Sequence, residues 1–89
     1  MPGRGGAIRK HSVKLSGHHT SLSLEEVYWE ALREVAREKG LSMTGLIERI
    51  DRERDGNLSA AVRVFLLQHY RSRAEERAGS ESALEPDPK

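Results

Sequence analysis

Polar and apolar residues alternate over residues 19–24, and this short stretch organises the rest of the predicted fold. Leu22 and Leu24 fall on one face of an extended chain. The opposite face carries three polar residues, His19, Ser21 and Ser23. A period of two predicts a β-strand with one face buried. Because a lone strand leaves its backbone amides and carbonyls without partners, we expect a second copy of the chain to supply the neighbouring strand.

A second alternating segment precedes that strand, because Val13 and Leu15 share one face of residues 11–16. Gly17 and His18 separate the two segments. This order allows a tight hairpin within the chain, and equally an extended arm that lies over a partner subunit. The sequence alone leaves both arrangements open.

A first amphipathic helix is expected from residue 24 or 25 to residue 39. Its apolar residues recur at helical spacing, and they are Val27, Tyr28, Ala31, Leu32, Val35 and Ala36. Ser23 and Glu26 have the spacing of a capping box at the start of this helix. Gly40 is suited to the left-handed residue that commonly ends a helix.

Two further helices are expected. Ser42 can cap the second, whose buried face comprises Met43, Leu46, Ile47 and Ile50. After the turn signal around Gly56, Asn57 can cap a third helix that starts near Leu58. Apolar residues cover more than one stripe of this third helix, so it needs contacts on two sides. A partner subunit would supply one of them.

Two large side chains within these helices have structural explanations. Trp29 lies off the centre of its apolar stripe, and we expect it to pack against a neighbouring helix or the partner rather than contact a ligand. Arg63 is the lone charge in the apolar part of the third helix. We expect it to form an ion pair with an acid such as Glu48 or Asp51.

The chain of 89 residues is long enough for one small domain. We divide it into a disordered basic arm (1–10), a folded domain (11–73) and a disordered acidic tail (74–89). The net charge is only +1, but residues 1–24 contain basic residues and no acid. Such a segment is compatible with a polyanionic partner.

Other classes of protein have little support in the sequence. No catalytic or cofactor motif is present, so we expect neither an enzyme nor a cofactor. His11, His18 and His19 lack the spacing of a metal site, and no metal is expected. The chain has no cysteine and no apolar run of membrane length. We therefore expect a cytoplasmic protein without membrane contact.

Several short motifs follow one another in a recognisable order. They are Thr20-Ser21-Leu22-Ser23-Leu24, Leu32-x-x-Val35-Ala36, Gly40-Leu41-Ser42 and Leu46-Ile47. This order resembles the ribbon-helix-helix family of bacterial DNA-binding regulators over residues 19–54. A further set of motifs extends the resemblance to about residues 11–71, namely Ser12-Val13, Gly17-His18, Thr20-Ser21, Tyr28-Trp29, Ile50-Asp51 and Asn57-Leu58-Ser59-Ala60-Ala61-x-Arg63-Val64-Phe65. They are similar to a small subgroup with an added third helix.

The resemblance implies a mostly α fold with one short β-strand region. Members are homodimers whose strands pair as an intermolecular two-stranded antiparallel ribbon, which enters the DNA major groove. Amides at the start of the second helix clamp a phosphate. Carried over to this sequence, the implied DNA-binding residues are Arg9, Lys10, Lys14, His18, His19, Ser21, Ser23, Ser42, Met43 and Thr44.

An alternative from another functional class stays open. The polar strand face carries no arginine, lysine, asparagine or glutamine, which are the residues that discriminate best between base edges. The same dimeric scaffold could instead bind a protein partner or a small ligand, as an antitoxin does with its toxin. Retention of DNA at low salt would distinguish the two functions.

Overall fold

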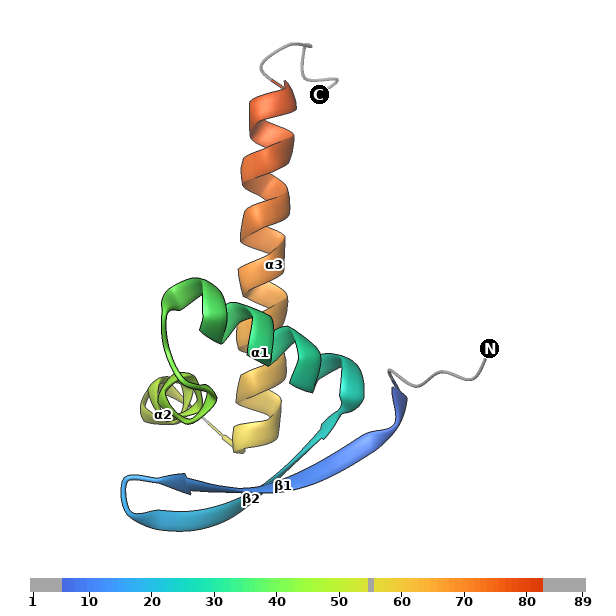
Figure 1. The fold of residues 1–89 in the computed structure, drawn as a ribbon. Coiled ribbons are helices and arrows are strands. Elements are labelled where there is room, and N and C mark those ends of the chain that lie inside the picture. Colours follow the sequence, from blue (N-terminus) through green and yellow to red (C-terminus); the bar gives the residue numbers. More distant parts are fainter. Residues whose placement is uncertain (1–5, 55, 83–89) are drawn as a thin grey trace.

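The computed structural model describes residues 6–54 and 56–82. Two strands come first and three helices follow, in the order β1 (Ile8–Leu15), β2 (His18–Glu25), α1 (Glu26–Lys39), α2 (Met43–Glu53) and α3 (Leu58–Ser82). The strands form a twisted hairpin, α1 and α2 lie over one face of it, and α3 rises away from it (Figure 1). This order confirms the expected architecture of a short β region with three helices.

A two-residue turn joins β1 to β2 within one chain. Ser16 and Gly17 both have positive φ angles, 52° and 85°, and this backbone lets a two-residue turn match the twist of its strands. The antiparallel register runs from the turn to the pair Ile8 and Glu25. Of the two arrangements that the sequence left open for residues 11–16, the structure has the hairpin.

The hairpin pairs one edge of β2 and leaves its other edge facing away from β1. The amide of Glu26 donates to the carbonyl oxygen of Ala7 at 2.7 Å. With this register, the even-numbered residues of β2 bond to β1. The backbone groups of His19 and Ser21 therefore point away from β1. A second chain could pair at this edge, and strand pairing between two chains stays a prediction.

Inward-facing residues of the hairpin and the helices form the core. Leu22 and Leu24 are 1% and 0% exposed, which confirms the face of the strand that the alternation predicted to be buried. Leu15 joins them from β1. The helices contribute Trp29, Leu32, Val35, Ala36, Leu46, Ile47, Ile50, Val62 and Leu66.

The junction between β2 and α1 differs from the expected capping box. β2 continues through Ser23 to Glu25, and Glu25 precedes α1 without a side-chain hydrogen bond to the helix. The Glu26 amide bonds instead to the Ala7 carbonyl across the hairpin. Because strand pairing already satisfies this first amide of the helix, a serine hydroxyl is not needed there.

The end of α1 and the start of α2 follow their sequence signals. Gly40 is left-handed, with φ 69° and ψ 29°, at the end of α1. Ser42 caps α2, because its Oγ accepts a hydrogen bond from the Gly45 amide at 2.9 Å. A Cβ on Gly45 would lie only 3.1 Å from that hydroxyl. Glycine at this helical position therefore leaves room for the cap.

Secondary structure extends past both ends of the expected domain of residues 11–73. The amide of Ala60 donates to Oδ1 of Asn57 at 2.7 Å, as expected for the cap of α3, but the helix continues to Ser82. β1 begins at Ile8, within the segment expected to be disordered, because residues 8–10 pair with β2. The rest of the arm (1–5) and of the tail (83–89) lies outside the described residues.

An ion pair joins the start of α3 to the end of β2. Arg63 Nε lies 3.0 Å from Glu25 Oε1. The expected ion pair of Arg63 is thus present, but its partner is neither Glu48 nor Asp51. Asp51 pairs instead with Arg54 at 2.6 Å. The partner differs because β2 extends to Glu25, which brings this carboxylate beside α3.

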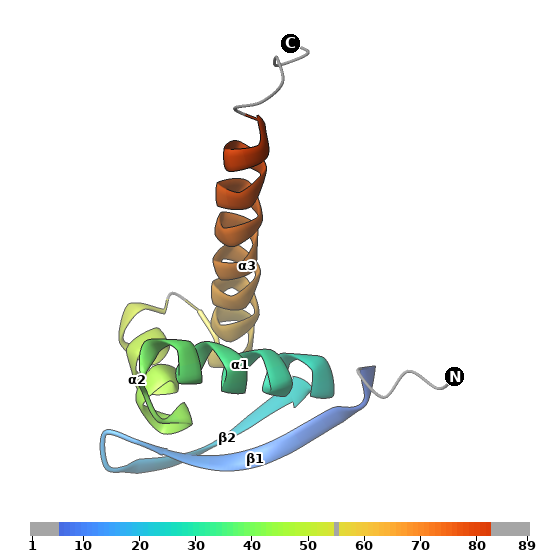
Figure 2. The same cartoon turned by 45° about the horizontal axis from the view of Figure 1, so that its top comes forward.

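Two further contacts hold α3 against α1. Arg73 Nη1 lies 2.6 Å from Glu38 Oε1, and Tyr70 donates its hydroxyl hydrogen to Glu34 Oε1 at 3.0 Å. The hydrogen bond from Arg73 holds the pKa of Glu38 below its usual value. Burial, with the added contact to Glu34, raises the pKa of Tyr70. These contacts fix the direction in which α3 leaves the rest of the fold (Figure 2).

Candidate nucleic-acid interface

The outward face of the hairpin gathers polar and basic side chains from both strands. Cross-strand pairs place Lys10 opposite Ser23, Ser12 opposite Ser21, and Lys14 opposite His19. We call these six residues the hairpin face. Ser23 is half-buried and the other five are exposed. Because the helices cover only the other side of the hairpin (Figure 1), the hairpin face is open to a large partner.

The charge of the hairpin face is positive along most of its length. Lys10 and Lys14 flank Ser12 on β1, each two residues away from it. The nearest acidic residue on this side of the hairpin is Glu25, which pairs with Ile8 at the end of the strands. A backbone hydrogen bond and the contact with Arg63 hold the pKa of Glu25 below its usual value. The carboxylate of Glu25 therefore forms its ion pair with Arg63 of α3. The hydroxyls of Ser12 and Ser21 lie between the two ammonium groups, and the imidazole of His19 lies opposite Lys14.

Two of the strand residues implied by the family resemblance do not lie on the hairpin face. Arg9 pairs with Leu24 on the inward side of the hairpin, and its Nε lies 2.6 Å from Glu26 Oε1. His18 is opposite Leu15, also on the inward side. Both alternate with the outward residues, because successive side chains of a strand point to opposite faces.

Trp29 anchors β1 to α1 beneath the hairpin face. Its indole Nε1 donates to the carbonyl oxygen of Arg9 at 3.0 Å, and its ring meets the ring of His11 edge-on with centroids 4.5 Å apart. Only 4% of Trp29 is exposed. The tryptophan is therefore buried within the fold, as expected, and it contacts β1 of its own chain. This contact holds Lys10 and Lys14 in register with β2.

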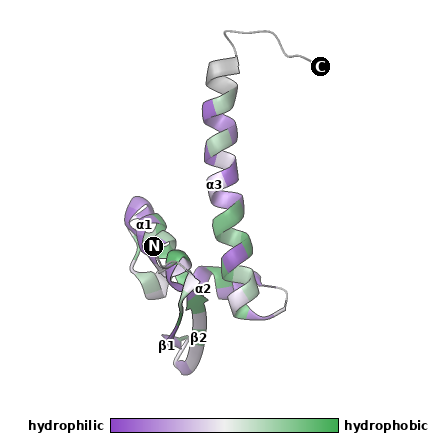
Figure 3. Ribbon diagram, turned by 90° about the vertical axis from the view of Figure 1, so that its right-hand side faces the viewer, coloured by the Kyte–Doolittle hydropathy of each residue, from purple (hydrophilic) through white to green (hydrophobic). Residues whose placement is uncertain are grey.

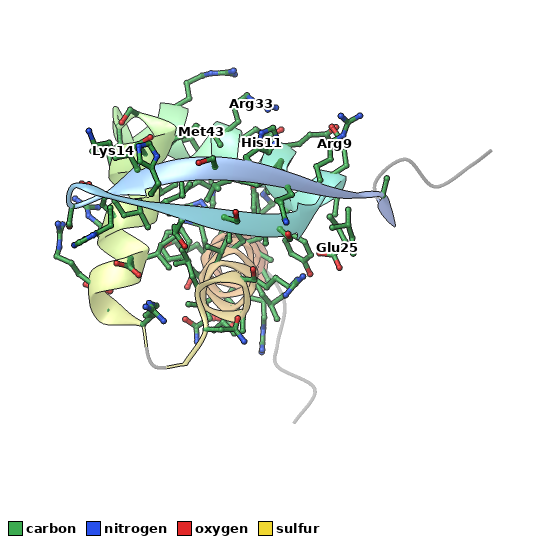
Figure 4. All side chains as sticks on the ribbon, turned by 90° about the horizontal axis from the view of Figure 1, so that it is seen from below. Arg9, His11, Lys14, Glu25, Arg33 and Met43 are labelled. Atoms are coloured by element: carbon green, nitrogen blue, oxygen red, sulfur yellow. The ribbon has the colours of Figure 1, made fainter. Side chains whose placement is uncertain are left out.

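The start of α2 lies beside the β1 edge of the hairpin face. In the view from below, Met43 is seen next to Lys14, beyond the edge of β1 (Figure 4). The first amides of a helix have no partner within it, so those of Met43 and Thr44 are available to an anion. The hydroxyl of Ser42 is committed to the Gly45 amide, so Ser42 acts as a cap.

Two residues near this face were missed by the sequence reasoning. Ser12 lies at the centre of the hairpin face, opposite Ser21. Arg33 is exposed and lies on the β1 side of the hairpin, between His11 and Met43 in the view from below (Figure 4). The alternation of residues 11–16 could have placed Ser12 beside Lys14. No sequence signal marks Arg33, because its position depends on how α1 crosses β1.

A polar cleft follows the other edge of the hairpin. Its volume is about 690 Å³, and it lies between the unpaired edge of β2, the end of α2 and the start of α3. The lining residues are Leu15, Ser16, His18, Thr20, Ser21, Asp51, Arg54, Asn57, Leu58, Ser59 and Arg63. Ser59 donates its hydroxyl hydrogen to the Ser23 carbonyl oxygen at 3.0 Å and closes one end of the free edge. The backbone of residues 19–21 stays open to the cleft.

Within residues 6–54 and 56–82, no group of three or more histidine, aspartate or glutamate side chains could hold a metal ion. Over the same residues, no helix has both the length and the apolar content to cross a membrane.

The ribbon-helix-helix domain family matches residues 8–70 of the chain. This chain belongs to that family. Its hairpin and first two helices supply the elements after which the family is named, and α3 is an addition to them. Ribbon-helix-helix domains typically belong to DNA-binding regulators or antitoxins. No curated protein matches the chain.

This ribbon-helix-helix protein is also similar to a solved structure, that of an uncharacterized protein from Bordetella pertussis Tohama I. The two chains are 31% identical, with a TM-score of 0.75. The similarity covers 86% of this chain and 66% of the other, so this chain spans just under two thirds of that protein. Because β1, β2, α1 and α2 occupy only about half of the sequence, the shared fold includes part of α3.

Proposed function

We propose that this ribbon-helix-helix protein is a dimeric, cytoplasmic DNA-binding regulator of transcription that acts by binding and not by catalysis. The observation that carries the proposal is the hairpin face. It combines Lys10 and Lys14 with a central pair of serine hydroxyls and a histidine opposite Lys14, and the helices leave it uncovered. A two-stranded ribbon has the width that a DNA major groove admits.

The hairpin face divides by chemistry into two kinds of contact. Ser12, Ser21 and His19 can exchange hydrogen bonds with base edges, with Ser23 at the margin. Lys10 and Lys14 carry the charge for phosphates, which set affinity and orientation rather than sequence preference. With so few discriminating side chains, phosphate contacts dominate the binding energy.

The β1 side of the hairpin offers a second group of phosphate contacts. The free amides of Met43 and Thr44 at the start of α2 form a helix N-terminal anion site. Arg33 of α1 lies on the same side (Figure 4). A duplex seated on the hairpin face would carry one of its phosphate backbones along this side.

The dimer forms at the unpaired edge of β2. Two copies of residues 19–21 pair antiparallel across a two-fold axis, so the predicted intermolecular pairing takes place between two hairpins instead of two single strands. The resulting sheet has four strands, and its two central β2 strands form the two-stranded ribbon for the major groove. It carries two copies of the hairpin face side by side, with Lys10 and Lys14 of each β1 flanking the ribbon. Doubling the positive charge in this way strengthens attraction to DNA.

A salt titration of DNA affinity tests the proposal. Fluorescence anisotropy with a labelled duplex should show affinity that falls steeply with salt, because each neutralised phosphate adds about −0.9 to the log–log slope. Lys14→Ala should lower affinity for every duplex and flatten the slope by about 1.8 for the dimer, which is about 0.9 for each of its two copies of Lys14. Lys39→Ala, at the end of α1, is the matched control and should change neither quantity.

Sequence preference is measured separately by selecting bound fragments from a random duplex library. Ser21→Ala should change the selected sequences and leave the salt slope unchanged. A wild-type protein that retains no duplex at low salt would refute DNA binding.

The polar cleft favours a second candidate function. An extended segment of another protein could pair with residues 19–21 and fill the cleft, as a dimeric protein-binding or antitoxin-like module would require. Specific peptide binding, together with the absence of DNA binding, would favour this candidate.

A further inference from the structure

The solvent side of α3 carries an apolar seam. Its residues recur at alternating spacings of four and three, as in helices that pack along their length. They are Ala60, Val64, Leu67, Arg71, Ala74 and Ala78, which we call the α3 seam. All six are exposed, and Val64 and Leu67 are 52% and 58% exposed. The opposite side of the helix supplies Val62 and Leu66 to the core.

The α3 seam lies beside a groove between α2 and α3. The groove has a volume of about 290 Å³, and Ala61, Val64 and Phe65 of α3 line it together with Ile50 of α2. Hydrophobic residues are dense in the part of α3 nearest the body and sparser toward its far end (Figure 3). Because α3 leaves the body on the side away from the hairpin (Figures 1 and 2), a partner on the seam would not cover the hairpin face.

The α3 seam is complementary to a second copy of itself in the antiparallel orientation. Full antiparallel overlap of residues 60–78 places Val64 against Ala74 of a second copy, and Ala60 against Ala78. Leu67 meets Arg71, whose aliphatic stem can cover a leucine while its guanidinium reaches water. Each large residue thus meets a small or flexible one over about 27 Å of helix.

Charge also favours this antiparallel orientation. A parallel pair would bring Arg71 against Arg71 and Glu75 beside Glu75, and such like-charge neighbours are destabilising. The antiparallel pair separates these residues. It also brings the end of α3, which carries Glu75 and Glu76, toward the start of the other α3, where Arg54 lines the groove.

We propose that the α3 seam is an interface with a second copy of this chain, in which two α3 helices pack antiparallel. The two-fold axis then places the two hairpin faces at opposite ends of the assembly, pointing away from each other. An assembly of this shape holds two DNA duplexes at once, and this consequence rests on the proposed function. The interface is separate from the free edge of β2.

The self-association is tested by measuring molar mass with light scattering and analytical ultracentrifugation. Leu67→Lys should weaken association through α3 by at least about tenfold, because the ammonium group would face Arg71 of the other copy. Ser72→Lys introduces the same charge on an exposed position outside the seam and is the matched control. Circular dichroism checks that both variants are folded. Equal association constants for wild type and Leu67→Lys, or a wild type that is monomeric throughout, would overturn the interface.

The orientation is tested by oxidative crosslinking, which is clean because the chain has no cysteine. Ala60→Cys protein mixed with Ala78→Cys protein should give mixed disulfide dimers. Ala78→Cys alone should give few, because its two copies lie at opposite ends of the seam. Efficient crosslinking of Ala78→Cys with itself would overturn the antiparallel arrangement.

Bridging is tested with one duplex on beads and a second, labelled duplex in solution. Wild type and Ser72→Lys should capture the labelled duplex, whereas Leu67→Lys should bind single duplexes as well as Ser72→Lys does and capture little. If wild type self-associates and binds single duplexes but does not capture the labelled duplex, the two-duplex assembly is overturned. Loss of single-duplex binding with self-association intact would refute the proposed function and leave the α3 interface standing.

Discussion

Replacing Trp29 tests whether β1 is a folded part of the domain. The indole is 4% exposed, donates to the Arg9 carbonyl oxygen at 3.0 Å and meets the His11 ring edge-on. Removing the whole side chain, as in Trp29→Ala, typically costs about 3–5 kcal/mol. A folded region of this size has about 4–11 kcal/mol in total. Trp29→Ala should therefore remove a large share of the stability and release β1 from α1.

Trp29→Phe gives a smaller and more specific effect. The phenyl ring keeps most of the packing but cannot donate to the Arg9 carbonyl, and one lost hydrogen bond costs about 1 kcal/mol. The edge-on contact with His11 contributes a further coupling of about 0.5–1.5 kcal/mol. A double-mutant cycle with His11→Ala and Trp29→Ala isolates that coupling.

Urea denaturation followed by circular dichroism supplies the free energies of unfolding. Val27→Ala is the control, because Val27 lies on the same helix and is 50% exposed, so its replacement should cost within about 0.5 kcal/mol. If β1 were a loose arm, Trp29→Phe would cost no more than this control, and His11 and Trp29 would show no coupling. Either result would refute the anchoring of β1 by Trp29.

Three further predictions concern the turn, a helix cap and the response to acid. Gly17→Val should destabilise the hairpin by about 1–2 kcal/mol, because φ is 85° at this position, while Gly17→Asn should cost clearly less; equal melting temperatures would contradict the turn geometry. Ser42→Ala should cost about 1 kcal/mol in urea denaturation, because the Gly45 amide loses its acceptor, and Ser42→Asp should restore most of it. The pKa of Glu38 is lower in the folded protein than its usual value of 4.5. The contact with Arg73 therefore stabilises the fold at pH values above 4.5, and this stabilisation is lost as the pH falls through the folded-state pKa. Glu38→Gln should accordingly reduce the decrease in the free energy of unfolding between neutral and acidic pH. An unchanged decrease would exclude this contact as its source.

Local sequence signals determined much of the fold of this ribbon-helix-helix protein. Alternation in residues 19–24 identified the buried face of β2, because side chains of a strand point to opposite sides in turn. Gly40, Ser42 and Asn57 marked helix ends correctly, since each acts through its own backbone conformation or a hydrogen bond three residues away. Such signals depend on neighbours within one helical turn, so they can be read without knowing the tertiary structure.

The tertiary structure decided what depends on contacts distant in sequence. Pairing of residues 8–10 with 23–25 turned part of the expected arm into β1. The same pairing carried β2 through Ser23, so that Glu26 found its acceptor on Ala7 instead of in a capping box. Arg63 paired with Glu25 for the same reason. Sequence patterns do not show which distant segments will pair, because several pairings satisfy the same alternation.

The same distinction between local sequence signals and tertiary contacts applies to the candidate site. The sequence determined that His19, Ser21 and Ser23 share a polar face, and that basic residues precede them. Only the hairpin register placed Lys10 and Lys14 on that face and turned Arg9 to the inward side. Only the crossing of α1 over β1 brought Arg33 beside it. The physical reason is that alternation fixes the relative direction of side chains within one strand, whereas the surface formed by two strands and two helices depends on how those elements pack.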